Sequence, residues 1–311
     1  MAGRDYTTTG LIESIKRRAQ IPINQSTFTA AKVLAYADDE MTDTVIPMVR
    51  KHRNDHFVTY EDVTTTAATA YDIPEEAMNR GLFNVGMLDG QGNPYALIPI
   101  NFDRELDIDT YWGSVIARSG GSARRGYYVR GDQVHLYPDS VADETLRLYY
   151  ERLQGKLIET SAAGLVTGVD SGTGVVTCSG GVPSSISTST PIDCINARPG
   201  FGLRFSAVTP SAKAATTVTI AAASAALVVV GDYIALEGES PIVQLPVEAH
   251  AKLAQAVAVK LKEALGHPGA VLAQEKLDRA EQNYGESFQT RVEQAPKRVF
   301  ARNRLSDFVR H

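Results

Sequence analysis

Few residues in this chain have the type and spacing that catalysis or metal binding requires. His52 and His56 stand four positions apart, which is a spacing compatible with two metal ligands. They lie in the charged run RKHRNDH, and no third ligand follows at a recognisable spacing. We therefore interpret the two histidines as the solvated end of a helix.

Nucleotide-binding and nucleophile motifs do not occur either. The run Gly86–Gly92 (GMLDGQG) is rich in glycine, but no Gly-Lys-Ser/Thr follows it, and its glycines fall in a predicted hairpin turn. The sequence has no Gly-x-Ser-x-Gly elbow, and neither Cys178 nor Cys194 has a histidine nearby. We therefore expect no catalytic, cofactor-binding or metal-binding residues, and an enzyme is the least supported function.

The N-terminal sequence and the two cysteines indicate in which cellular compartment the protein stays. The opening MAGRDYTTTG has no apolar signal-peptide core, and no apolar run approaches the ~20 residues of a membrane span. We therefore expect a chain that stays in the cytosol where it is made. In that compartment two cysteines favour free thiols, with a disulfide as the alternative.

The C-terminal segment from residue 295, APKRVFARNRLSDFVRH, is the most distinctive stretch. Five basic residues face a single Asp307, and large apolar residues are interleaved with them. Such a segment is either a solvated, disordered end or a segment that folds onto a neighbouring protein and buries its aromatic rings there.

A second basic pair, Arg124 and Arg125 in SGGSARRGYY, is predicted at a loop tip. It is either a solvated turn or an anchor for an acidic partner, because the guanidinium fork matches a carboxylate. The candidate partner-interface residues are Lys297, Arg298, Phe300, Arg302, Arg304, Phe308, Arg124 and Arg125.

The amino-acid composition and the net charge indicate which class of partner the protein binds. The chain has 311 residues, of which 43% are hydrophobic and 22% charged, which is typical of a globular protein. Its net charge is -5. A protein that grips nucleic acid usually has a basic balance or a basic face, so the charge argues against DNA binding as the main task.

The elements that must position these residues are organised around the stretch 244–266. Leu253, Val257, Leu261 and Leu265 recur every four residues and predict one apolar helical stripe, with Lys252, Lys260, Lys262 and Glu263 on the opposite face. Pro246 suits the first helical position and Gly266 a left-handed cap. A lone helix cannot bury this stripe. Its partners are predicted helices at 9–19, at 29–53 with a kink at Pro47, and at 271–291.

Between residues 56 and 152 the pattern changes to strands. Alternation predicts a strand at 56–60, hairpins at 81–100 and 126–137, and a strand at 144–152 with Leu146, Leu148 and Tyr150 on its buried face.

Residues 161–231 contain only five charges among many Ser, Thr, Gly, Ala and Val residues. This segment is either a disordered linker or, as its β-branched alternation favours, a small β-barrel or sandwich with strands at 165–169, 175–178, 203–208, 216–220 and 232–236. The predicted class is α+β: a discontinuous helical bundle with a β-hairpin region (1–158 and 240–311, the tail from about 295) and an inserted β domain (159–239).

Three segments together resemble the head-to-tail connector (adaptor) proteins of tailed bacteriophages, particularly those of short-tailed and crAss-like phages. They are Leu11–Val49, the hairpin GYYVRGDQVHLYP (126–138) leading into TLRLYYERLQGKLI (145–158), and SPIVQLPVEAHAKLAQAVAVKLKEALG (240–266). The β-rich insertion departs from the smallest adaptors, so the resemblance carries no role for residues 161–239.

The resemblance implies a virion structural protein that is assembled in the host cytoplasm. It implies a ring of twelve subunits below the portal, with helices around a channel, strands toward the tail or nozzle rings, and the C-terminal tail reaching the portal. DNA would pass through the lumen without specific binding, no cofactor or membrane would be involved, and a tail that orders on docking would keep subunits monomeric until the portal is present. The alternative is a surface or carbohydrate-binding module that acts through the β insertion.

Overall fold

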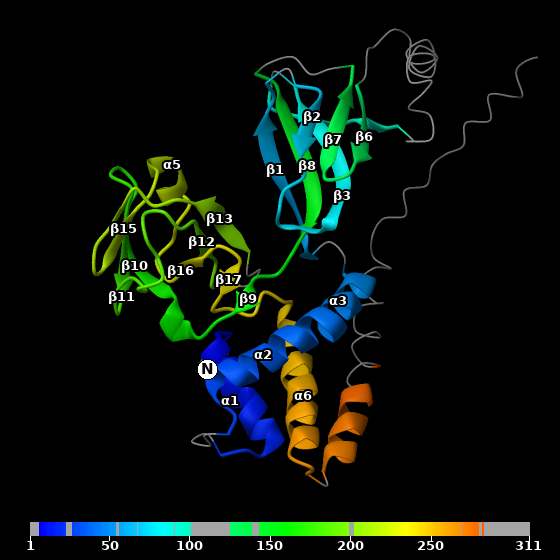
Figure 1. Cartoon of the computed structure of the whole chain (residues 1–311), viewed down its shortest axis with the longest axis vertical. Helices are drawn as coiled ribbons and strands as arrows, with labels where there is room; N and C mark the ends of the chain where they lie inside the picture. The colour runs from blue at the N-terminus through cyan, green and yellow to red at the C-terminus, as the bar shows by residue number, and fades with distance from the viewer. Residues whose placement is uncertain are drawn as a thin grey trace, which may run out of the picture. The chain divides into compact units, whose positions relative to one another are not determined.

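The computed structural model describes residues 6–22, 27–53, 56–66, 68–89, 91–100, 125–138, 143–198, 202–267, 269–279 and 282. It confirms the predicted α+β class (Figure 1). Two compact units divide the chain: residues 1–53 with 245–311 form the helical unit, and residues 54–244 form the β unit. The hairpin strands thus share a unit with the insertion, whereas the sequence grouped them, up to residue 158, with the helices.

The helical unit is built from both ends of the chain. Its helices are α1 (Thr8–Ala19), α2 (Ala30–Glu40), α3 (Ile46–His52), α6 (Val247–Ala264) and a helix at 270–279. Thr29 caps α2, because its hydroxyl accepts a hydrogen bond from the Lys32 backbone N–H at 3.3 Å. The remainder of the helix predicted at 271–291 lies outside the described residues.

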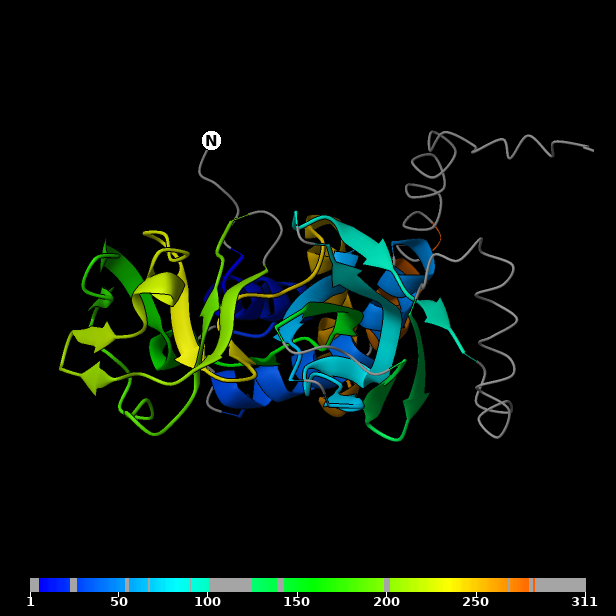
Figure 2. The same ribbon diagram turned by 90° about the horizontal axis from the view of Figure 1, so that it is seen from above.

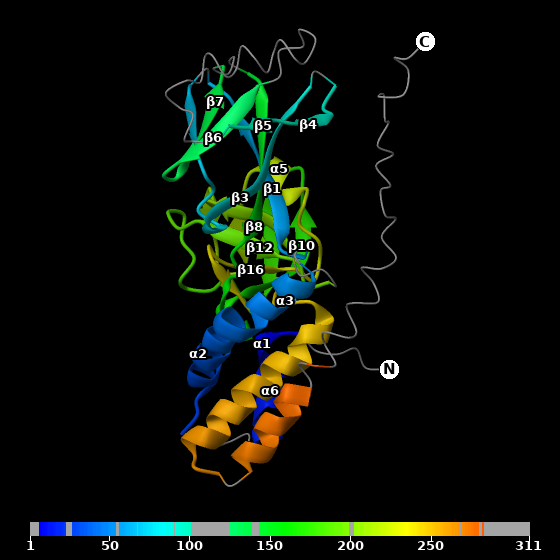
Figure 3. The same ribbon diagram turned by 90° about the vertical axis from the view of Figure 1, so that its right-hand side faces the viewer.

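The centre of this unit is α6, which packs against α1 and α2. Leu253, Val257 and Leu261 are fully buried, as the four-residue period predicted. Buried Ala256 and Val259 meet the helix at 270–279, which lies beside α6 in Figure 3. The helical core therefore joins segments more than 200 residues apart in sequence.

Several details of α6 differ from the prediction. Pro246 is the N-cap and not the first helical residue. Leu265 is 43% exposed because α6 ends at Ala264, before the stripe does, while Gly266 has the predicted positive φ of 61°. Lys252 and Lys262 were predicted on the solvent face, yet both are buried, and Lys252 Nζ donates to the Met48 sulfur at 2.5 Å.

The kink predicted at Pro47 takes the form of a π-helical turn at Met41–Val45 between α2 and α3. Pro47 has no N–H, and its ring would clash with a carbonyl of the preceding turn in a regular α-helix. A wider turn before the proline relieves that clash.

Two four-stranded sheets make up the hairpin region of the β unit, in the orders β1-β8-β3-β4 and β2-β7-β6-β5. Their strands are β1 (Val58–Thr64), β2 (Ala70–Asp72), β3 (Ala77–Leu88), β4 (Pro94–Ala96), β5 (Ile98–Pro99), β6 (Gly126–Arg130), β7 (Gln133–Tyr137) and β8 (Thr145–Arg152). Both sheets bury side chains in one core, which contains the predicted Leu146, Leu148 and Tyr150 of β8. The predicted hairpins are therefore parts of a small sandwich.

The insertion is one seven-stranded antiparallel sheet in the order β13-β12-β16-β10-β11-β15-β14, which Figure 2 shows as a curled sheet in green to yellow. Its strands are β10 (Gly164–Asp170), β11 (Val175–Ser179), β12 (Ile192–Ile195), β13 (Leu203–Val208), β14 (Ala212–Lys213), β15 (Thr217–Thr219) and β16 (Tyr233–Leu236), with a short helix α5 (Ala222–Ala225). The sequence missed β12, whose four residues are all buried.

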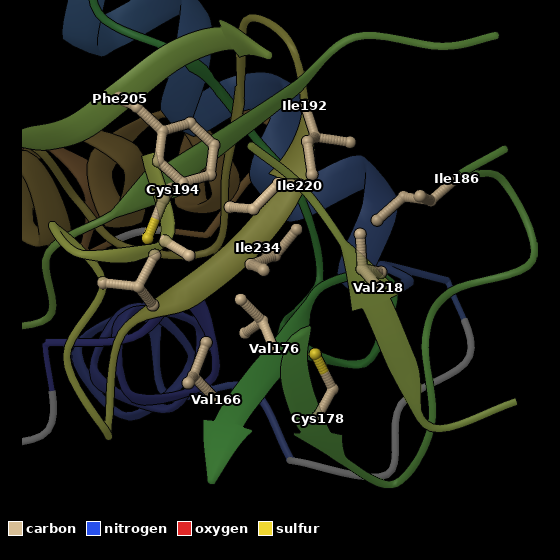
Figure 4. Close-up of a cluster of buried hydrophobic side chains, with 12 residues drawn as sticks. Val166, Val176, Cys178, Ile186, Ile192, Cys194, Phe205, Val218, Ile220 and Ile234 are labelled. Carbon is tan, nitrogen blue, oxygen red and sulfur yellow. The ribbon is translucent and has the colours of Figure 1, made fainter. Parts of the chain in front are cut away.

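The chain enters and leaves the insertion through two short strands that pair with each other. A 3-10 turn at Thr160–Ala162 follows β9 (Lys156–Leu157), which pairs in parallel with β17 (Glu239–Ser240). Inside, twelve buried residues form a single core (Figure 4), to which β12 contributes Ile192 and Cys194. The segment is thus a folded β region and not a disordered linker.

Candidate interaction surfaces

Most of the predicted partner-interface residues lie outside the described part of the chain. They are Arg124, Lys297, Arg298, Phe300, Arg302, Arg304 and Phe308. Their role therefore stays a prediction from the sequence.

Arg125 is described, and its guanidinium forms an ion pair with Glu144 within the β unit. Its side chain is only 16% exposed, and Nη1 also lies 3.4 Å from the Met87 sulfur. The backbone of Glu144 is in turn bonded to Thr65, whose N–H donates to the Glu144 carbonyl at 2.8 Å. The charge that the loop-tip hypothesis assigned to an acidic partner is thus engaged inside the sandwich.

The helical unit has a groove of about 410 Å³ between α1 and α6. Its lining includes the arginines Arg17 and Arg18 and the half-buried Val247, while the lining residues Leu11 and Ala254 are themselves buried. The rings of Tyr6 and His250, which also line the groove, meet edge to face at 5.2 Å. Two exposed guanidinium groups beside a groove suit an acidic protein segment better than a small neutral ligand. We call this site the α1/α6 groove.

The two arginines of the α1/α6 groove are exposed and lie in the last turn of α1. Arg18 is held in place, since Nη1 donates to Gln255 Oε1 at 3.2 Å and Nε to Ser14 Oγ at 3.4 Å. Burial, followed by the neighbouring charge of Arg17, lowers the pKa of Arg18. Within the described residues neither arginine forms an ion pair with an acidic side chain, although Glu13 also lines the groove.

The β unit has a cavity of about 270 Å³ with the opposite charge. It is lined by the carboxylates of Glu75, Glu76, Asp193, Glu237 and Glu239 and by the guanidinium of Arg152. Glu75 and Glu76 precede β3, Arg152 ends β8, and Asp193 lies in β12. Glu237 lies in the turn between β16 and β17, and Glu239 begins β17. We call this set of side chains the acidic rim.

The carboxylates of the acidic rim repel one another. Burial, followed by the charge of Asp193, raises the pKa of Glu76 to about 7. Burial likewise raises the pKa of Asp193 and of Glu237, and it lowers the pKa of Arg152. Asp193 accepts two backbone N–H bonds, from Ala207 and Gly238, both at 2.9 Å. Arg152 therefore compensates only part of the negative charge.

The described residues of the acidic rim do not form a metal site. Among the described residues, no group of three or more His, Cys, Asp or Glu side chains could hold a metal ion. Outside the cavity lining, Arg80 Nη2 lies 4.0 Å from Glu75 Oε1, with both side chains well exposed. An exposed pair of this kind contributes little, so the rim keeps its negative character.

Cys178 and Cys194 are free and buried in the core of the insertion, as the sequence favoured (Figure 4). Burial raises the pKa of Cys178 to about 11 and raises that of Cys194 as well. A thiol that stays protonated and buried is a poor nucleophile and a poor ligand. These residues act as core side chains.

Charge divides between the two compact units. The helical unit contains 19 basic and 14 acidic residues, whereas the β unit contains 12 basic and 22 acidic residues. The sequence showed a mild overall acidity, and only the division into units reveals that the two parts have opposite net charge. The α1/α6 groove and the acidic rim are local concentrations of these two signs.

Comparison with protein-family models and with curated proteins finds no match to this chain. In the part of the chain that the structure describes, no helix has the length and apolar character needed to cross a membrane. Function is therefore inferred from the surfaces above and from the arrangement of the elements.

Proposed function

We propose that this chain is a virion structural protein, the subunit of a ring that joins the capsid vertex of a tailed bacteriophage to its tail. The helical unit that both chain ends build is the observation that carries the proposal. Its central helix α6 bonds to the N-terminal helices, through Gln255 to Arg18 and through Lys260 to Glu40 at 3.6 Å. This is the arrangement that the resemblance to connector proteins implies for a ring wall.

The charge of the two units supports the same proposal. A channel that passes DNA must not hold it, and phosphate binding by Lys and Arg is what makes a protein hold DNA. Outside the tail from residue 295, the helical unit, which the resemblance places around the channel, has 14 basic and 13 acidic residues, so it has almost no net positive charge with which to hold DNA. We assign the basic tail from residue 295 to a protein partner, the portal.

The alternative of a carbohydrate-binding module has less support. Sugar recognition commonly uses exposed aromatic rings, but the described aromatic side chains of the insertion, Phe205 and Tyr233, are buried. Its exposed large apolar residues are the aliphatic Leu227 and Val230. These suit contact with protein.

The test is binding to the portal protein of the same phage by a chain truncated after Ala295. We expect the truncated chain to keep the far-UV circular dichroism of the full chain and to lose portal binding. A matched full-length variant, K297Q/R298Q/R302Q/R304Q, separates charge from length and should also bind more weakly. Unchanged binding by the truncated chain would refute the proposal for the tail.

A further inference from the structure

We infer that the α1/α6 groove of one copy receives the acidic rim of a second copy, in a head-to-tail contact between the helical unit of one subunit and the β unit of the next. The inference deepens the proposed function by naming the surfaces through which copies meet. A contact between two different surfaces of identical subunits is heterologous, and it closes into a ring when the rotation between copies allows it.

The groove requires a partner with negative charge. Arg17 and Arg18 are adjacent, exposed and without an acidic ion-pair partner among the described residues, and burial, followed by the charge of Arg17, lowers the pKa of Arg18. The basic last turn of α1 is favourable to its own helix, which accounts for basic residues there but not for their position beside a groove. Among the apolar residues that line the groove, the half-buried Val247 and the exposed Ala251 are the ones that a docked segment would shield from water.

The rim provides that negative charge on a surface of the same protein. Five carboxylates line one cavity with a single guanidinium, and Glu75 and Glu237 are its exposed members. A guanidinium brought to the rim would relieve the mutual repulsion of these carboxylates and form charge-assisted hydrogen bonds. Because both surfaces occur on every copy, each subunit can use its groove and its rim at once.

The charges of the two units favour this orientation over a contact between two β units. Outside the tail from residue 295 the helical unit has 14 basic and 13 acidic residues, whereas the β unit has 12 basic and 22 acidic residues. A contact between two β units would therefore bring like charges together, and a contact between the helical unit and the β unit would not. A single contact built on exposed charges is weak. Dilute subunits are therefore monomeric, and the contact acts when a portal gathers many copies.

Reciprocal charge reversal of the full-length chain tests the inference. We expect wild-type protein to associate with increasing concentration in sedimentation velocity. Raising the NaCl concentration from about 0.01 M to about 1 M, which shortens the Debye length from about 30 Å to about 3 Å, should abolish the association. The groove variant R17E/R18E and the rim variant E75K/E237K should each associate at least about tenfold more weakly than wild type.

An equimolar mixture of these two variants should regain association, because the reversed groove then meets the reversed rim and the unchanged groove meets the unchanged rim. The control K32E/K276E reverses two exposed charges of the helical unit outside the groove and should associate like wild type. Circular dichroism of each variant checks that it is folded.

The inference is overturned if wild type does not associate at all, if the mixture regains nothing, or if the control loses as much as the groove variant. Failure of the proposed function looks different. A ring on the portal that forms equally well with the groove variant would reject the groove–rim contact and keep the ring. Salt-sensitive, charge-complementary association without any ring on the portal would keep the groove–rim contact and reject the ring.

Discussion

Replacing Glu76 by glutamine tests the electrostatics of the acidic rim. Burial and the charge of Asp193 raise the Glu76 pKa from the ordinary 4.5 to about 7, so its charged form is disfavoured in the folded chain. The folded state then binds more protons than the unfolded state between these two pH values. Stability consequently falls as pH rises from 4.5 to 7 and is constant above that range, as far as this group is concerned.

The pKa difference sets the size of the effect. A pKa of about 7 against 4.5 corresponds to at most about 3.5 kcal/mol of unfolding free energy, because one pKa unit is about 1.4 kcal/mol. Glutamine carries no charge at any pH. The unfolding free energy of E76Q minus that of wild type should therefore increase from pH 4.5 to pH 8 by about 1 to 3 kcal/mol. The attraction between the Glu76 carboxylate and Arg152 exists only when Glu76 is ionised, so its loss is already contained in the pKa difference.

The assay is urea unfolding followed by circular dichroism at a series of pH values, with wild type and E76Q side by side. The control is E75Q, which makes the same replacement at the neighbouring residue, whose side chain is 87% exposed. Carbon-13 NMR titration of labelled glutamate carboxyls, with the Glu76 signal identified by its loss in E76Q, measures the pKa directly. A Glu76 pKa near 4.5, or a flat difference for E76Q, would refute the reasoning.

Three further predictions concern packing and thiol chemistry. L253A removes a fully buried side chain from α6 and should lower the unfolding free energy by about 2–5 kcal/mol in urea titrations, and a loss below about 1 kcal/mol would contradict the helical core. G174A should cost about 2 kcal/mol or more, because φ at Gly174 is 74° and a Cβ atom there would overlap the Ile220 carbonyl oxygen; a wild-type melting temperature would disprove this. Cys178 and Cys194 should resist thiol reagents in the folded chain and react once urea unfolds it, since burial raises both pKa values, and fast labelling of native protein would argue against the buried placement.

Periodicity predicted the parts of the fold that a local pattern determines. Leu253, Val257 and Leu261 repeat at the helical period, and β8 alternates at the strand period, so their buried faces could be read directly. The same logic failed at Leu265, because a stripe can continue past the end of its helix. It also failed at Lys252, whose long apolar stem can be buried although its ammonium group is charged.

Pairing between strands that lie far apart in the sequence could not be predicted from periodicity. The strand β12 has only four residues and stands among Pro, Asn and Arg, which are typical of turns, yet tertiary pairing with β13 and β16 makes it a buried strand. The stacking of the hairpins into two sheets depends on β1 pairing with β8, about 90 residues later. A sequence pattern carries no signal for such partners.

Neither candidate surface was predicted from the sequence. The acidic rim collects side chains from positions 75 to 239, and the α1/α6 groove joins Arg17 with His250. Each residue alone is typical of a solvated surface. Of the eight residues that the sequence selected for a partner interface, only Arg125 is described, and its ion pair with Glu144 shows that an arginine assigned to a partner can be engaged within its own unit.

Imaging of the purified chain with the portal protein of its phage tests the central claim most directly. The account predicts a closed ring of copies on the portal, with the helices of both chain ends in its wall and adjacent copies meeting groove to rim. Single copies bound to the portal without contact to one another, or no complex at all, would contradict it.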